Sequence, residues 1–487
     1  MVHLFIHRRD LRIHDNVTLS KQLSYIVSGG IEATFLPIFI FTPEQINEDK
    51  NQYYSNNLVQ FMCESLKELY DEYQSFGIKM LFFYGDVIDV LKNISNNVDI
   101  ESIGFNFDYS PYSIKRDDAI ENFAKKNSIK IFNSEDMLLV NITHDATLSP
   151  NSGQPYKVYT PFYNRVVKIP VEKVNNKHIS WLKKVGDFEK KNLKNNSNNI
   201  EKKLLRDEIK KIIIDVNQLG KFYNHKKNKF IAKPGRSAAI AQLSKVKYQK
   251  DYSNMAPIEQ KTTELSPYIN LGLLSIREIY YKIKEQKFQT KSLIGELYWR
   301  DFYYNILYFF PHIVNGNFNE KPNIKWWGTR EQFDKWCIGQ TGVPIVDAAM
   351  RHMNTTGFMP NRCRMIVASF LVKNLGINWR AGEQYFSNKL TDYNVSANNG
   401  GWQWVAGTGA SSQPYYQIFN PFTQSKLYDP EANYIKKWVP ELNSLTAKQI
   451  HTWDKLANSG LNVRYPAPIA NYMMSKTKFI DQHKKNK

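Results

Sequence analysis

The sequence predicts an α/β domain followed by a larger all-helical domain. Across the first 135 residues, short apolar runs of strand length alternate with longer amphipathic helical patterns. This alternation is typical of a parallel sheet with helices on both faces. After residue 204 the strand patterns vanish, and helical periodicity continues to the end of the chain. We therefore expect a doubly wound, Rossmann-like domain over 1–135, a connector over 136–203 and a helical domain over 204–487.

Five apolar runs are the expected strands of the first domain. They lie at 2–5, 34–41, 79–84, 103–107 and 129–132, with helical patterns between them, notably at 56–75 and 113–126. No G-x-G-x-x-G pattern follows the first run, so a nicotinamide-type pyrophosphate site there is not supported. The segment 190–203 is rich in Lys and Asn and poor in apolar residues, which predicts a solvated, mobile linker.

The chain of 487 residues carries a formal net charge of +19. This basic balance fits a polyanionic partner such as nucleic acid. AT-rich coding, which enriches Lys and Asn, explains the excess equally well, so both interpretations stay open. No apolar run reaches membrane-spanning length, and the first strand runs directly into His7-Arg8-Arg9-Asp10 instead of a signal-peptide pattern. We expect a soluble intracellular protein with no membrane partner.

The three cysteines, Cys63, Cys337 and Cys363, are far apart in the sequence. Their number and spacing argue against a disulfide framework, a zinc site and a four-cysteine iron–sulfur cluster. We predict no metal site.

A nearly all-apolar helix is predicted over 292–310, and it carries polar groups on one face. Glu296, Trp299, Arg300 and Tyr303 recur at helical spacing. A carboxylate and a guanidinium on a buried face are costly unless they are paired. Two interpretations are open: a structural Glu296–Arg300 ion pair, or a cavity lined by a carboxylate, an indole and a phenol.

A second helix is predicted to begin near Pro360, with Asn361, Arg364 and Met365 on one face. Taken alone, this polar face favours a helix surface exposed to solvent. The stretch 392–404, DYNVSANNGGWQW, is too rich in amides, glycine and tryptophan for ordinary core, and its glycines allow backbone to approach a flat ligand. The hydroxyl-rich segment 262–266 precedes helical sequence, where it can hold a phosphate or form a plain N-cap.

Several motifs together resemble those of the photolyase/cryptochrome family, most closely class I cyclobutane-dimer photolyases. They are RDLR at 9–12, GELYWRDFY at 295–303, GVPIVDAAM at 342–350, NNGGWQW at 398–404, GTG at 407–409 and IFNP at 418–421. Each is moderately specific, but their order and spacing match the family over almost the whole chain. The resemblance implies light-driven splitting of cyclobutane pyrimidine dimers in UV-damaged DNA, a carbon–carbon lyase reaction.

The resemblance also implies FAD in the helical domain, active in its fully reduced anionic form. The cofactor contacts that it implies are Tyr248, Thr262, Thr263, Glu264, Leu265, Ser266, Arg300, Arg364, Asp392, Asn394 and Asn398. Asn398 stands where photolyases place an amide beside flavin N5, and plant-type cryptochromes carry an acid there. An amide can accept from N5–H without adding charge, which suits an anionic flavin.

A pocket for a flipped-out dimer is implied as well. Its expected lining is Glu296, Trp299, Tyr303, Asn361, Arg362, Met365 and Trp404. Glu296 would stabilise the dimer radical anion as a catalytic group. Related (6-4) photolyases carry histidine where Met365 stands, which favours cyclobutane dimers.

A tryptophan chain that carries an electron to oxidised flavin is also implied by the resemblance. Its members would be Trp402, Trp379 and Trp326, with Trp327 as an alternative outermost member.

Six positions depart from the family pattern, among them Ile6 and His7, which replace the usual Trp-Phe. Glu264 stands where relatives usually have Arg, and Asn394 where many have Asp, so their cofactor contacts stay open. Tyr112 and Ser113 stand where folate-binding relatives have Asn and Glu. We still expect the cleft between the domains, and both the presence and the identity of a second, antenna chromophore in it stay open.

The main competing function is that of a cryptochrome-type light-signalling protein without repair activity. Cryptochromes commonly carry long C-terminal tails, whereas the family match here runs to about residue 472 and leaves only a short Lys-rich end. Two further functions stay open, those of a (6-4) photolyase and of a non-catalytic nucleic-acid-binding protein. We expect a monomer in the cytoplasm, or in the nucleus if the source is eukaryotic.

Overall fold

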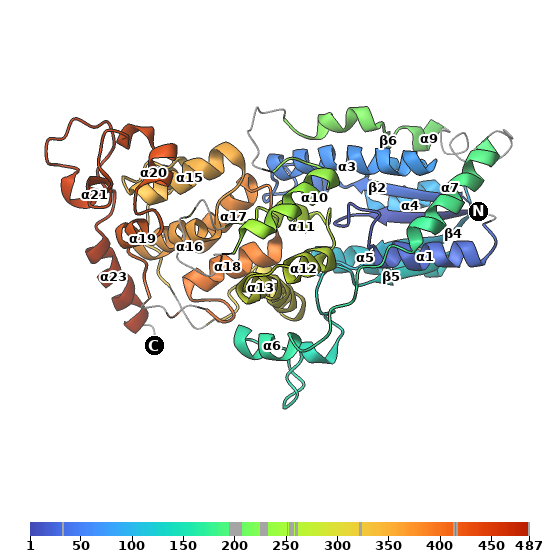
Figure 1. Ribbon diagram of the computed structural model, residues 1–487, viewed down its shortest axis with the longest axis horizontal. Helices are drawn as coiled ribbons and strands as arrows, with labels where there is room; N and C mark the ends of the chain where they lie inside the picture. Colours follow the sequence, from blue (N-terminus) through green and yellow to red (C-terminus); the bar gives the residue numbers. More distant parts are fainter. Residues whose placement is uncertain are drawn as a thin grey trace.

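The computed structural model describes residues 1–31, 34–193, 207–224, 232–250, 252, 258, 262–320, 324–412, 414 and 417–485, and every structural statement below concerns these residues. The molecule is elongated, with the sheet and the N-terminus toward one end and the last helices toward the other (Figure 1). Within the described ranges, no helix combines the length and the apolar composition that a membrane span requires.

Six strands form one sheet in the order β5-β4-β1-β2-β3-β6. Their bounds are β1 Val2–His7, β2 Thr34–Phe41, β3 Leu81–Tyr84, β4 Ile100–Asn106, β5 Lys130–Ser134 and β6 Ile213–Ile214. The first five are parallel, as the sequence predicts. β6 pairs antiparallel with β3, so the prediction that strands end before residue 204 is wrong. Its two residues are too few to produce a period-2 pattern in the sequence.

Both faces of the sheet are buried, because apolar side chains alternate onto two separate cores. In β1, Leu4 and Ile6 join one core while Phe5 joins the other, and the neighbouring strand β2 alternates in the same way. One face is covered by α1 Val17–Ser28, α3 Asn56–Phe76 and α7 His178–Leu193. The other is covered by α4 Val87–Ser95, α5 Pro111–Lys126 and α9 Asp207–Lys210. This is the doubly wound arrangement that the sequence predicts.

The connector is more structured than the sequence suggests. Residues 190–193 of the predicted mobile linker belong to α7, which packs on α1 and β2, and 194–203 lie outside the described residues. The connector also contains η1 Asp145–Thr147 and α6 Tyr159–Val166. The domain limits of 1–135, 136–203 and 204–487 stay predictions, although α7 and β6 both complete the α/β layer.

Helices dominate the remainder of the chain. They are α10 Arg236–Ser244, α11 Ser266–Asn270, α12 Ile276–Lys284, α13 Lys291–Phe309, α14 Arg330–Ile338, α15 Pro344–Thr356, α16 Asn361–Ser369, α17 Trp379–Lys389, α18 Val395–Ala406, α19 Pro421–Tyr428, α20 Asn433–Trp438 and α23 Tyr472–Lys485. Shorter elements are α2 Pro43–Ile46, α21 Ala447–Ile450, α22 Trp453–Leu456, the 3-10 helices η2 Val216–Phe222, η3 Lys245–Tyr248, η5 Pro311–Val314 and η7 Pro440–Leu442, and the π-helical turn η6 Phe370–Asn374.

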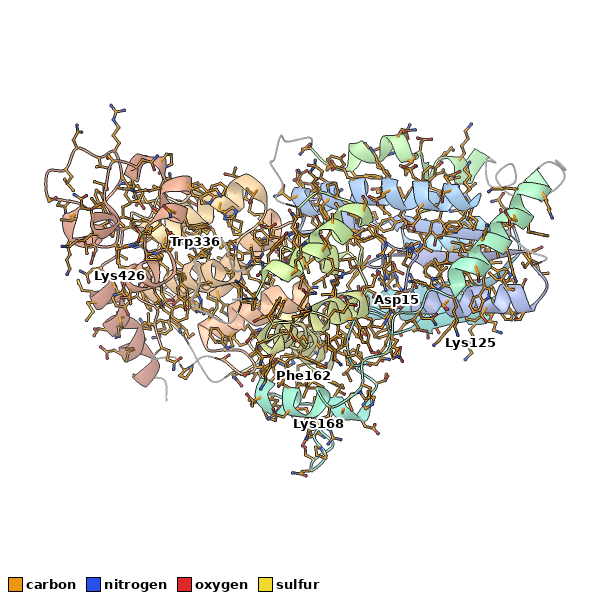
Figure 2. The ribbon with its side chains drawn as sticks, in the orientation of Figure 1. Asp15, Lys125, Phe162, Lys168, Trp336 and Lys426 are labelled. Carbon is orange, nitrogen blue, oxygen red and sulfur yellow. The ribbon has the colours of Figure 1, made fainter. Side chains whose placement is uncertain are left out.

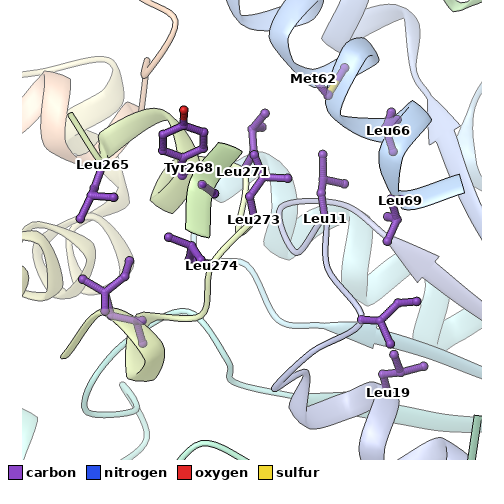
Figure 3. Close-up of a cluster of buried hydrophobic side chains, with 14 of the residues drawn as sticks. Leu11, Leu19, Met62, Leu66, Leu69, Leu265, Tyr268, Leu271, Leu273 and Leu274 are labelled. Carbon is purple, nitrogen blue, oxygen red and sulfur yellow. The ribbon is translucent and has the colours of Figure 1, made fainter. Parts of the chain in front are cut away.

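The two domains share a continuous apolar core. Figure 3 shows Leu11, which follows β1, between leucines of the α11 region and those of α3. Next to it, Arg277 of α12 donates to Asp15 (2.8 Å, Nε to Oδ2) and Asp136 (2.7 Å, Nη2 to Oδ1), and Arg12 also pairs with Asp136. All four of these charged side chains are buried. This interdomain charge cluster fixes how the helical domain sits on the sheet domain.

Candidate active site

A cavity of about 520 Å³ lies in the helical domain, enclosed by α11, α12, α13, α16 and α18. The structure brings most of the predicted site residues to its wall. These are Thr262, Thr263, Glu264, Leu265, Ser266, Glu296, Trp299, Arg300, Tyr303, Asn361, Arg364, Met365, Asp392, Asn394, Asn398, Trp402 and Trp404. Segments separated by more than a hundred residues in the chain therefore meet at one cavity.

Four predicted residues lie outside the described lining of the cavity. The side chain of Tyr248, at the end of η3, is 71% exposed. Arg362 is half-buried on α16, next to lining residues. Trp379 is buried at the start of α17, and Trp326 is half-buried. Their predicted contacts with cofactor or substrate stay predictions.

Hydroxyl and ionic groups gather at one part of the wall. Arg364 donates from Nη2 to Asp392 Oδ2 at 2.7 Å, and the Ser266 hydroxyl donates to the same oxygen. The other Asp392 oxygen, Oδ1, is buried and lacks a hydrogen-bond partner among the described residues. A buried carboxylate oxygen without a donor is costly, so it marks a place where a ligand can donate.

The segment 262–266 does not form a plain N-cap. The N-cap residue of α11 is Leu265, and no side chain caps this helix. The Thr262 hydroxyl instead accepts from the backbone N–H of Glu264, which has a positive φ of 53°. This left-handed backbone conformation is uncommon for a residue other than glycine. Glu264 adopts it and also lines the cavity. Burial raises the pKa of Glu264, and nearby Lys245 opposes the shift.

The N-terminal half of α18 forms another part of the wall. Asn394 caps this helix by accepting from the Ala397 N–H. Asn398 donates from its amide to the Glu383 carbonyl at 3.0 Å, which orients its side chain. Gly401 is on the cavity wall, and a Cβ placed on it would point into open space, with no atom within 4 Å. The helix surface is therefore hollowed where a flat group could lie against it.

The wall formed by α13 carries Glu296, Trp299 and Tyr303, as the helical spacing predicts. The structural Glu296–Arg300 ion pair is wrong as an interpretation, because Arg300 donates to the Met137 carbonyl at 2.7 Å and contacts Asp301. Glu296 lines the cavity, and its side chain is exposed. Enclosure by protein raises its pKa, and the positive charge of Arg362 opposes this shift. A raised pKa favours a carboxyl group that keeps its proton and can donate it.

The face of α16 is likewise not a simple solvent surface. Asn361 is exposed at the start of the helix, but Arg364 and Met365 are half-buried and line the cavity with it. Trp404 adds a half-buried indole from α18. Apolar rings, a thioether, an amide and a carboxyl group therefore surround one end of the cavity.

Trp402 lines the cavity and is only 3% exposed. It packs on α17 at Gly382, where an added Cβ would lie 2.2 Å from its ring, one turn after Trp379. Its ring is also 6.1 Å from that of Trp336, a buried residue that sequence reasoning missed. Trp379 donates its indole N–H to Asn317.

Several other lining residues were not predicted from the sequence. They are Tyr252, Ile269, Asn270, Ile279, Ile283, Leu293, Leu297, Phe358, Met359, Ala368, Phe386, Leu390, Tyr393, Ala397, Gly401 and Val405. Most are apolar or aromatic, and in the sequence they are indistinguishable from core positions. Tyr393, Ala397 and Gly401 lie within the stretch 392–404, whose amides, glycines and tryptophans had already indicated a flat ligand.

The cavity suits a planar ring system attached to a phosphate tail. Hydroxyl groups and Arg364 lie at one part of the wall, the hollow at Gly401 can receive a flat ring, and Asp392 Oδ1 awaits a donor. The residues present therefore fit FAD.

Comparison with known proteins agrees with this fit. The model of the FAD binding domain of DNA photolyase matches residues 293–485, and the DNA photolyase model matches residues 3–177. A deoxyribodipyrimidine photo-lyase of Halobacterium salinarum is 30% identical, over 96% of this chain and 96% of that protein. One from Synechococcus sp. is 33% identical, over 98% and 95% of the two chains.

Solved structures agree as well. A photolyase from Sulfolobus tokodaii with two FAD molecules superimposes with a TM-score of 0.79 at 32% identity and covers all of both chains. A class III photolyase from Agrobacterium tumefaciens gives a TM-score of 0.79 at 26% identity, over 99% and 97% of the two chains. The chain belongs to the DNA photolyase family and carries its FAD-binding domain.

Proposed function

We propose that this protein is a deoxyribodipyrimidine photo-lyase that splits cyclobutane pyrimidine dimers in UV-damaged DNA. The observation that carries the proposal is a single cavity that joins a wall suited to FAD with the Glu296, Trp299, Met365 and Trp404 wall. Reduced FAD, when bound, supplies an electron under light and takes it back after the ring opens. The protein's own groups bind and orient the lesion and the cofactor, and they donate hydrogen bonds to the lesion.

Glu296 acts on the lesion. Enclosure raises its pKa, so the carboxyl group can hold a proton and donate a hydrogen bond to a pyrimidine carbonyl as negative charge develops there. Trp299 and Trp404 supply apolar rings on which flipped bases stack, and the Asn361 amide can pair with a base edge. No atom is transferred between the bases in this reaction, so Met365 need not donate a proton.

On the cofactor side, Asn398 is the residue that favours an anionic reduced flavin. Its amide nitrogen is engaged with the Glu383 carbonyl, which leaves the carbonyl oxygen to accept from a flavin N–H. Arg364 supplies positive charge within the same wall and is paired with Asp392. Together they support the fully reduced anionic form as the active one.

We further propose that Trp402, Trp379 and Trp326 conduct an electron toward oxidised FAD. Trp402→Phe should stop photoreduction of the bound flavin while repair by chemically reduced enzyme continues. Trp438→Phe, on α20 and stacked on His352, is the control. Flavin absorbance during illumination measures the rate of photoreduction. Photoreduction at the wild-type rate in Trp402→Phe would exclude the chain, and a Trp336→Phe variant tests whether electrons pass through Trp336 instead.

A second chromophore is part of the proposal. The Sulfolobus tokodaii structure is described as containing two FAD molecules with a novel light-harvesting cofactor. Here Tyr84, at the end of β3, and Tyr112, at the start of α5, are 37% and 48% exposed, which offers stacking surfaces at the carboxyl edge of the sheet. Titrating the FAD-loaded protein with FAD, a deazaflavin or a reduced folate should give saturable binding of one of them. If none of the three binds, the antenna proposal fails.

Lesion choice is the direct test of the function. Reduced enzyme is illuminated with a cyclobutane dimer or a (6-4) photoproduct in the same DNA sequence. We expect repair of the dimer only, because the (6-4) reaction calls for a proton donor such as histidine where Met365 stands. Comparable (6-4) repair would contradict this choice, and FAD-loaded protein that repairs neither lesion would favour a cryptochrome function. The cytoplasmic location and the monomeric state of this protein stay predictions.

A further inference from the structure

Helix α6 lies against the outside of α13, the helix that carries Glu296 and Trp299. In Figure 1 it lies beneath α13, and Phe162 and Lys168, in and just after this helix, are labelled in Figure 2. Its buried anchors are Phe162 and Val166, which are at most 1% exposed. Phe162 packs on Phe302 of α13, with ring centroids 5.5 Å apart. The helix is therefore a fixed support.

Tyr159, the first residue of α6, stacks on Trp299. The ring centroids are 3.6 Å apart and the planes differ by 8°. Trp299 lines the cavity, whereas Tyr159 lies outside the described lining. One indole face is thus covered from outside the cavity, while the remainder of Trp299 stays available to a ligand.

The Tyr159 hydroxyl makes a second connection to the same turn of α13. It donates to the Gly295 carbonyl at 3.0 Å, one residue before Glu296. Burial raises the pKa of Tyr159, so the hydroxyl remains a protonated donor at neutral pH. A single side chain therefore holds both the indole and the backbone that carries the carboxyl group.

We infer that Tyr159 is a positioning residue that sets the Trp299 ring and the Glu296 turn for the lesion. An indole on a cavity wall loses the freedom of two side-chain torsions when a ligand binds. A parallel stack on one face already restricts these torsions in the free protein, which lowers the entropy cost of binding. The inference rests on the proposed function, because the lesion is the ligand that the ordered wall receives.

The test compares three variants of the FAD-loaded protein. Tyr159→Leu removes the stack and the hydrogen bond, and Tyr159→Phe removes only the bond. Val166→Ala is the matched control: it shortens a buried side chain of the same helix, seven residues after Tyr159. Affinity for dimer-containing and undamaged oligonucleotides is measured by fluorescence anisotropy, and the splitting rate is measured at saturating DNA.

We expect Tyr159→Leu to weaken binding of the damaged oligonucleotide by about fivefold to tenfold. Binding of undamaged DNA and flavin photoreduction should stay unchanged, and Tyr159→Phe should restore most of the affinity. In a Trp299→Leu background, Tyr159→Leu should cost little more, because the two residues act as one unit.

Two results would overturn the role of Tyr159. One is full lesion affinity in Tyr159→Leu, and the other is an equal loss in Val166→Ala, which would indicate general weakening of α6. If wild-type protein itself does not prefer damaged DNA, the proposed substrate fails and this inference fails with it. A wild-type preference that Tyr159→Leu retains removes only the inference.

Discussion

The charge cluster between the domains and the carboxyl group of Glu296 at the cavity wall differ in burial and in pairing: the four charged side chains of the cluster are buried, whereas Glu296 is exposed. In the interdomain charge cluster, Arg277 is shared by Asp15 and Asp136. Burial lowers the pKa of Arg277, but the two carboxylates outweigh it and hold that pKa above its usual value. At the cavity wall, loss of solvation by the surrounding protein raises the pKa of Glu296 and outweighs the opposing positive charge of Arg362.

The difference separates stability from function. A paired buried charge contributes little net stability, but removing its partner leaves an unpaired buried charge and strongly destabilises the fold. The cluster therefore favours the one domain arrangement in which all its charges are paired. A carboxyl group left without a close cation is poised to change its protonation or to meet a ligand. The Arg364–Asp392 pair lies between these cases, because one Asp392 oxygen is paired and the other awaits a donor.

Arg277→Met should have the largest effect. It strands Asp15 and Asp136 in the interdomain interface, and we expect the free energy of unfolding to fall by about 3–5 kcal/mol. Urea titration measures this value. Arg330→Met, which breaks the exposed pair with Asp334, is the control and should leave the free energy of unfolding almost unchanged. Glu296→Gln should leave unfolding unchanged within about 0.5 kcal/mol and yet reduce dimer splitting. Equal destabilisation by Arg277→Met and Glu296→Gln would break the comparison.

The pH dependence of stability gives the next effect, through Glu383 behind Asn398. Burial raises the pKa of Glu383 to about 7, opposed by a hydrogen bond from Asn399. Because the folded protein holds this proton more tightly than the unfolded chain, the stabilisation is complete below the unfolded pKa. It is lost as pH rises through the folded pKa of about 7, by up to about 3 kcal/mol.

Glu383→Gln should reduce the fall in the free energy of unfolding between about pH 4.5 and pH 7, as measured by urea titration at several pH values. This variant should not abolish the fall, because burial also raises the pKa values of Glu189, Asp301 and Asp347. Glu285→Gln, on an exposed pair with Lys282, is the control that should retain the full fall. An unchanged fall in Glu383→Gln would mean that Glu383 is already ionised in the folded protein.

The smallest effect concerns cations at the rim of the cavity. Arg362 makes no ion pair among the described residues, although its guanidinium lies over the Tyr428 ring at 4.6 Å. We expect Arg362→Gln to weaken binding to damaged DNA and to lower the slope of log affinity against log salt by about 1. Arg351, which is paired with Glu441, is the matched control. If Arg351→Gln changes the slope equally, pairing does not decide which cations meet DNA.

Sequence periodicity was sufficient for the elements with strong local signals. The five long strands and α13 fall within a few residues of their predicted positions, because alternation and helical spacing are set by neighbours in the chain. β6 was missed because its two residues have meaning only beside β3. The sequence over 150–163 predicts an aromatic loop, and this prediction is wrong from residue 159 onward, where α6 begins.

By itself the sequence determined the fold class, the family motifs and the one-sided helix that carries Glu296, Trp299 and Tyr303. The tertiary structure alone decided what each polar group meets. It turned Arg300 toward the Met137 carbonyl instead of Glu296, and it placed Tyr159 behind Trp299, 140 positions further along the chain. Pairing and enclosure depend on groups that converge from distant segments, and no local pattern in the chain encodes that convergence.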